Sequence, residues 1–204
     1  MKNWFNDLKN IDTRTLNFDF ATSWLQATAS LVQIENYTYF SEAEQTRPSQ
    51  YDETINYFKI KAGNEIKLGL FALDTDLIYQ KVSNGSDVYK LPDFIARSTF
   101  YFSKVFFEKR SLFLQTGVTV NYFTAYNADN YNPLLGEFTL QKDDLVGGKP
   151  ILDVFINAQI RRTRLYFSFE NLLQLTQDNY YYSAPNLPYK DFTIKFGFIW
   201  NFFK

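Results

Sequence analysis

Paired carboxylates are the residues of this chain whose types and spacing come closest to catalytic or metal-binding chemistry. Asp143 and Asp144 are adjacent, beside a Gly-Gly pair that is typical of solvated turns. Asp74 and Asp76 lie two positions apart, where a strand would place both side chains on one face. Two carboxylates can divide the acid and base roles of hydrolysis, but two oxygens fall far short of the ~6 to 8 ligands that Ca²⁺ takes. We predict no catalytic residue and no metal site.

The composition excludes further classes of function. The 204 residues include no His and no Cys, so the commonest general base, the commonest transition-metal ligand and any disulfide are absent. Enzymes built as outer-membrane barrels generally rely on a His, which this chain cannot supply. The formal net charge of -1 provides no basic face for nucleic acid. We therefore expect no enzyme activity, no cofactor and no nucleic-acid partner.

Another group of charged residues is predicted to line a lumen. Asp153 and Glu170 are almost equally far from the turn between their strands, and Lys195 is about as far from the carboxy terminus. The three should lie at similar heights on consecutive strands, with Arg161 near the periplasmic end and Arg97 on the polar side of another strand. They could form a charged constriction that orients solutes. Alternatively, they form a salt-bridged wall with no role in transport.

The elements that must position these residues are strands. Aromatic residues make up 20% of the chain at a mean hydropathy of only -0.30, as alternating lipid-facing and water-facing positions produce. No run is long and apolar enough for a transmembrane helix. Apolar and polar residues alternate in about eight runs, near residues 25–31, 55–61, 65–81, 95–107, 111–123, 151–160, 164–171 and 192–203. The register of the second run is ambiguous, and the third loses phase near Asp74.

The connections between these runs alternate in length. Long polar connections lie near residues 41–52, 82–93, 126–149 and 174–190. Tight turns are expected at 62–64, 108–110 and 161–163. Short periplasmic turns and long extracellular loops are typical of an up-and-down outer-membrane β-barrel, which places the carboxy terminus in the periplasm. We predict barrel strands over residues 16–204, preceded at 1–15 by a periplasmic or truncated lead-in segment.

The last strand carries the most specific pattern. Its apolar face would be an aggregation hazard in water but is expected in lipid; it consists of Phe192, Ile194, Phe196, Phe198, Trp200 and Phe202. Lys195, Gly197, Trp200 and Phe202 resemble the assembly signal of outer-membrane barrels, although two residues follow the final aromatic. This resemblance implies recognition by the barrel-assembly machinery.

Three segments also resemble the closing part of the Bacteroidota porins grouped as "putative porins". They are Lys149 to Asn157, Arg164 to Asn171 with its Glu-Asn end, and Tyr181 to Tyr189. The resemblance extends from about Trp24 to the end and is most specific after Gly148. It implies a porin-like architecture in a longer protein whose amino-terminal strands are missing here, and no particular solute.

The size of the barrel decides between the alternatives. Eight strands enclose only side chains, whereas an aqueous channel needs something like ~16. We therefore expect the chain to be part of a larger pore for passive diffusion of small hydrophilic solutes, completed by amino-terminal strands or another chain and surrounded by outer-membrane lipid and lipopolysaccharide. The alternatives are a small closed barrel with a structural or surface-binding role, and a soluble β-sandwich.

Overall fold

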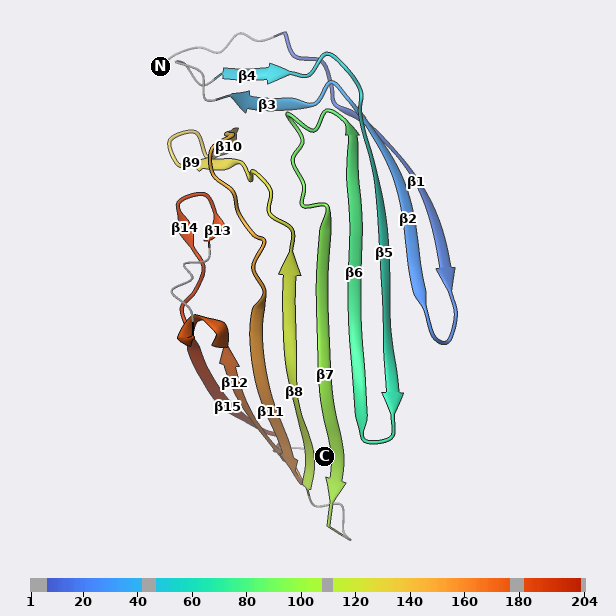
Figure 1. The fold of residues 1–204 in the computed structure, drawn as a ribbon, viewed down its shortest axis with the longest axis vertical. Helices are drawn as coiled ribbons and strands as arrows, with labels where there is room; N and C mark the ends of the chain where they lie inside the picture. The colour runs from blue at the N-terminus through green and yellow to red at the C-terminus, as the bar shows by residue number, and fades with distance from the viewer. Residues whose placement is uncertain (1–6, 42–46, 108–111, 177–181, 203–204) are drawn as a thin grey trace.

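The computed structural model describes residues 7–41, 47–107, 112–176 and 182–202, and its architecture is all-β, as predicted. One antiparallel sheet has the order β1-β2-β5-β6-β7-β8-β11-β12-β15 (Figure 1). Its strands are β1 Asp12–Ala21, β2 Gln26–Glu35, β5 Ile55–Leu68, β6 Phe71–Asn84, β7 Phe94–Phe106, β8 Leu112–Phe123, β11 Ile151–Ile160, β12 Thr163–Glu170 and β15 Thr193–Trp200. Each strand pairs with the next long strand of the chain, which is the pattern of an up-and-down barrel wall.

The sheet has nine strands where about eight were predicted. The additional strand is β1, which pairs with β2 from Asp12↔Glu35 to Ala21↔Gln26. Residues 12–15, which we placed in the lead-in segment, therefore belong to the sheet. Leu16, Phe18 and Phe20 alternate with polar residues along β1, so the strand follows the same period as its neighbours.

The predicted turn at residues 62–64 is wrong. β5 continues through it to Leu68, and the turn falls at Gly69 and Leu70. Gly69 has a φ of +64°, and glycine is favoured at this first position of a two-residue hairpin turn. The run predicted over 65–81 thus crosses a turn, which reverses the parity of its outward residues and explains its lost phase.

Short and long connections lie at opposite ends of the sheet (Figure 1). Short turns follow β1, β5 and β11, at residues 22–25, 69–70 and 161–162. The turn predicted at 108–110 lies outside the described residues. Long connections span residues 36–54, 85–93, 124–150 and 171–192. β15 ends beside the β11–β12 turn, since Trp200 pairs with Thr163, so the chain leaves the sheet at the short-turn end.

The two faces of the sheet differ in chemistry. The registers of the paired strands place apolar side chains on one face of the sheet, with at least one from each of the nine strands. They include Phe18, Leu31, Ile60, Leu73, Phe100, Val118, Ile156, Phe167 and Phe196. The opposite face carries Asp, Glu, Lys, Arg, Asn, Gln, Ser and Thr side chains. Two strands, β1 and β15, are edges without a partner among the described residues, so the sheet is not closed into a barrel here. No helix within the described ranges has the length and apolar character needed to cross a membrane.

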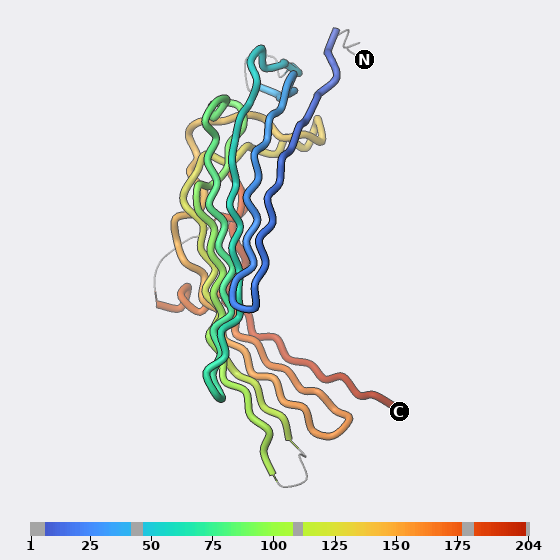
Figure 2. Tube along the Cα trace, turned by 90° about the vertical axis from the view of Figure 1, so that its right-hand side faces the viewer, coloured from blue at the N-terminus to red at the C-terminus, as the bar shows by residue number. Residues whose placement is uncertain are grey.

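Three of the long connections form a loop cap, defined here as the described parts of residues 36–54, 85–93 and 124–150. The cap contains a sheet of order β4-β3-β10-β9, made of β3 Thr38–Ser41, β4 Arg47–Gln50, β9 Asn130–Asn132 and β10 Glu137–Leu140. In Figure 2 the gold segment of residues 124–150 crosses the long-loop end of the main sheet. The fourth long connection contains the 3-10 helix η1 Leu172–Leu175 and a hairpin of β13 Tyr182–Ala184 and β14 Leu187–Pro188.

Candidate functional site: the polar face and its loop cap

The structure brings together Glu170 and Lys195, two of the residues predicted to line the lumen. Lys195 Nζ lies 2.8 Å from Glu170 Oε2. The Glu170 side chain is only 16% exposed, and it also accepts a hydrogen bond from Lys190 at the end of the fourth long connection. The hydrogen bond that Lys190 donates to Glu170 raises the pKa of Lys190 above its usual value. One carboxylate thus joins two strands and a loop.

Asp153 is bound to the wall as well. Its Oδ1 accepts the backbone N–H of Asn171 at 2.9 Å, and its Oδ2 accepts Asn121 Nδ2 at 3.4 Å. Asn171 is buried, has a φ of +57° and donates its side-chain amide to the Lys190 carbonyl at 2.9 Å. Asp153 and Glu170 therefore fix both ends of the connection 171–192. Whether these charges also orient solutes, or only hold the wall together, stays a prediction.

The two arginines stand apart from this group. Arg161 is the first residue of the β11–β12 turn, with a φ of +53°, and is exposed at the opposite end of its strand. Arg97 is exposed on β7, where its register partners are Asp76 and Asn121. It makes no ion pair with any residue that the structure describes. Whether these five residues line a closed lumen stays a prediction, because the sheet is open here.

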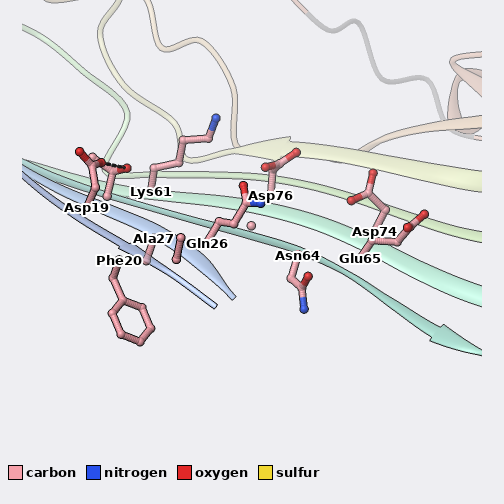
Figure 3. A pocket seen from close by; sticks show the side chains of 12 residues that line it. Asp19, Phe20, Gln26, Ala27, Lys61, Asn64, Glu65, Asp74 and Asp76 are labelled. Atoms are coloured by element: carbon pink, nitrogen blue, oxygen red, sulfur yellow. Dashed lines mark hydrogen bonds between the residues drawn. The ribbon is translucent and has the colours of Figure 1, made fainter. Parts of the chain in front are cut away.

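A second group of charges lies on the polar face of β1, β5 and β6. Figure 3 shows Asp19, Lys61, Glu65, Asp74 and Asp76 on the same side of the sheet, around a hollow of about 530 Å³. Our prediction omitted most of them, because the register of residues 55–61 was ambiguous and β1 was not recognised. The alternation of Phe18, Asp19 and Phe20 was the signal that could have located Asp19.

Two of the carboxylates of this second group, Glu65 and Asp19, have ordinary partners. Glu65 lies 2.5 Å from Lys67 Nζ and accepts the Tyr101 hydroxyl. Asp19 accepts a hydrogen bond from Thr28 at 2.6 Å. Over the described parts of the chain, no three His, Cys, Asp or Glu side chains gather as a metal site would require. The chemistry of the hollow is that of a hydrated, charged surface.

The other predicted carboxylate pair is a turn. The backbone N–H groups of Asp143 and Asp144 both donate to Gln141 Oε1 at 2.8 Å. The two side chains are exposed. This agrees with solvated turn residues.

The four residues of the assembly-signal pattern occupy both faces of the last strand. Lys195 and Gly197 lie on the polar face, and the Tyr166 ring of β12 covers Gly197 so closely that an added Cβ would lie 2.3 Å from Tyr166 Oη. Trp200 and Phe202 are exposed on the apolar side and stack with ring centroids 5.0 Å apart. Recognition of this pattern by an assembly machinery stays a prediction.

A buried polar network inside the loop cap was not predicted. The Lys90 side chain is 9% exposed, lies 3.5 Å from Asp129 Oδ1 and donates to the Gln141 carbonyl. Burial raises the pKa of Asp129 above its usual range, while nearby Lys90 acts in the opposite direction. Burial, together with Tyr57, raises the pKa of Tyr89 to about 12. These contacts join different loops, so no local pattern in the sequence indicates them.

An antiparallel wall that is apolar on one face and charged on the other is the pattern expected of a barrel-type membrane protein. A family described as "Putative porin" matches residues 1–204, and the chain belongs to that family. No protein with a curated description matches it.

Two solved structures share its fold. The FrpB iron transporter from Neisseria meningitidis has a TM-score of 0.60 at 11% identity, over 95% of this chain and 32% of the transporter. The copper transporter OprC has a TM-score of 0.58 at 20% identity, over 86% of this chain and 26% of the transporter. The chain therefore spans about a third or less of the length of these proteins.

Proposed function

We propose that this chain forms part of the wall of an outer-membrane pore through which small hydrophilic solutes diffuse passively. The observation that carries the proposal is the division of the nine-stranded sheet into one apolar and one polar face. In lipid the apolar face is stable and the polar face must meet water, so the wall borders an aqueous lumen. The family supports the same function.

The two free edges determine what else the pore needs. Backbone N–H and C=O groups cannot remain unpaired in a bilayer, so β1 and β15 need partner strands. The small closed barrel that we considered as an alternative would pair β1 with β15, and here both are edges. We infer that further strands of the same protein, or another chain, complete the wall, with outer-membrane lipid and lipopolysaccharide around it and the barrel-assembly machinery inserting it.

The charges on the polar face bear on which solutes pass. The face carries as many acidic as basic side chains on the nine strands: Asp19, Glu65, Asp74, Asp76, Asp153 and Glu170, with Lys59, Lys61, Lys67, Arg97, Arg164 and Lys195. Opposite charges on neighbouring strands largely cancel beyond a Debye length of ~8 Å in physiological salt. This part of the wall therefore favours neither cations nor anions strongly and suits uncharged polar solutes.

The test uses the full-length protein, purified and refolded into lipid. In planar bilayers it should give stepwise conductance that is proportional to voltage and needs no energy source. Liposomes that contain it should swell in uncharged sugars at rates that fall as the sugar grows. A protein that keeps its heat-dependent gel mobility, and is therefore folded, but shows neither conductance nor swelling would overturn the proposal.

A further inference from the structure

The polar face changes character beneath the loop cap. Val32 and Ile34 of β2 and Ile55 of β5 lie on the same face as the lumenal charges, but they are apolar and buried, with Ile55 0% exposed. Val88 of the cap packs against them. In an open, water-filled mouth these three side chains would meet solvent. The wall is therefore built to receive the cap on its lumenal side.

The cap is a connected body. β3 pairs in parallel with β10 through Phe40↔Thr139, which joins residues 36–54 to residues 124–150. The Tyr37 and Tyr89 rings meet edge to face with centroids 5.4 Å apart, which joins residues 36–54 to residues 85–93. Three loops that are far apart in the sequence thus form one connected unit over the polar face.

Lys90 provides the polar contact between two loops of the cap. It comes from residues 85–93, and both of its partners, Asp129 and the Gln141 carbonyl, come from residues 124–150. Gln141 in turn donates to the Ala128 carbonyl, so the segment that receives Lys90 is itself tied together. A charge this buried is retained only where it is paired, and losing one partner leaves the other uncompensated.

We propose that the loop cap is the constriction of the pore and that Lys90 is the positioning residue that holds it over the lumen. The size limit for solutes is then set at the long-loop end and not by the charges at mid-wall, which are engaged in fixing strands and loops. This inference rests on the proposed function, and it adds which element selects solutes.

The experiment compares variants of the full-length protein in planar bilayers and sugar-loaded liposomes. Lys90→Met keeps most of the length of the side chain and removes its charge, so the cap should loosen. Conductance should then rise or switch between levels, and larger sugars should enter. Lys90→Arg retains the pair with Asp129 and should restore wild-type conductance. Lys104→Met removes an exposed lysine from the apolar face of β7, at the short-turn end and outside the cap, and should change neither quantity.

The outcomes separate this inference from the proposed function. If wild type conducts and Lys90→Met gives the same conductance and the same size limit, the cap is not the constriction and the inference fails while the proposed function stands. If wild type is folded but silent, both fail. An equal effect of Lys104→Met would show that any lost positive charge matters, which would also overturn the role of Lys90. Heat-dependent gel mobility of each variant checks that the wall is intact.

Discussion

Gly197 shows what a missing side chain contributes to a strand of this wall. The ring of Tyr166 on the neighbouring strand occupies the space where a Cβ would lie. Gly117 and Tyr101 form a second pair of this kind, with a Cβ position 2.6 Å from Tyr101 Cβ. Glycine weakens a strand by its flexibility, and the ring covers the exposed backbone in return. The glycine of the terminal pattern therefore has a packing role inside the wall.

Gly197→Ala should destabilise the folded barrel by about 1 to 3 kcal/mol, because the added methyl group overpacks against Tyr166. The fraction of protein that keeps the fast-migrating folded form on unheated gels measures the effect. In the double variant with Tyr166→Ala the ring is gone, so most of the folded fraction should return. If the double variant folds no better than Gly197→Ala, the glycine is needed for recognition during assembly and not for packing.

The raised pKa of Tyr89 implies that the folded loop cap loses stability at high pH. Burial raises its pKa to about 12, above the ordinary value of 10.0. A raised phenol pKa stabilises the folded cap fully below the unfolded value, and this stabilisation is lost as the pH rises from 10.0 to about 12. The difference in phenolate absorbance between wild type and Tyr89→Phe should show one phenol ionising near pH 12 in the folded protein. Ionisation near the ordinary value before unfolding would contradict the buried setting.

Counting residues from the turn and from the carboxy terminus predicted that Glu170 and Lys195 lie at similar heights on neighbouring strands, and the structure pairs the two side chains. The same count could not predict that Lys190 shares Glu170, or that Asp153 binds the Asn171 backbone. Both contacts come from the connection 171–192, whose path follows no period. Sequence reasoning therefore located the charges on the strands but not the loop contacts that decide what the charges do.

At the scale of elements, Gly63 and Asn64 look like a turn and are not one. Gly63 sits inside β5 opposite Asp76, where an added Cβ would lie 2.5 Å from Asp76 Oδ1, the mobile end of a side chain. The turn is made by Gly69, whose surroundings are open but whose backbone is left-handed. From the sequence alone, Gly63 and Gly69 are equally good candidates for a turn. Only the pairing of β5 with β6 shows which of them forms it.

Gly69→Ala should lower the free energy of unfolding by roughly 1 to 2 kcal/mol, the cost of a left-handed conformation for a residue with a Cβ. Gly69→Asn should cost less, because Asn tolerates that conformation. Gly63→Ala should also have a small effect, since the Asp76 carboxylate can turn aside. Denaturant unfolding of the lipid-refolded protein measures all three. A larger loss from Gly63→Ala than from Gly69→Ala would place the turn at the earlier position after all.

Long strands were easier to predict than short ones for a physical reason. A strand such as β11 Ile151–Ile160 presents one face to lipid along its whole length, and the alternation is visible in ten residues. The cap strands β3, β9 and β10 have four residues or fewer, and β3 pairs with β10 of a distant connection. Their formation depends on tertiary contacts, so sequence periodicity indicates neither the cap nor the contacts of Lys90 within it.

At the scale of the whole molecule, the apolar face must be in lipid and the polar face in water. Ile156 and Asn157 are neighbours near the middle of β11 on opposite faces. Ile156→Lys should therefore cost about 2 to 4 kcal/mol of unfolding free energy in a bilayer, if it lies near the midplane, whereas Asn157→Lys should be close to neutral. Equal losses for the two variants would show that the faces do not differ in environment.

Labelling of thiols on the two faces of the wall tests most directly which face meets water. These 204 residues contain no Cys, so Leu114→Cys and Gln115→Cys each add one thiol, on opposite faces of β8. The experiment uses full-length protein from which any other Cys has been removed, folded in lipid. A charged, water-soluble maleimide should label Gln115→Cys and leave Leu114→Cys unmodified, while a lipid-soluble quencher should reach only a fluorophore on Leu114→Cys. Equal labelling of both thiols, or labelling of Leu114→Cys alone, would contradict a membrane wall that borders an aqueous lumen.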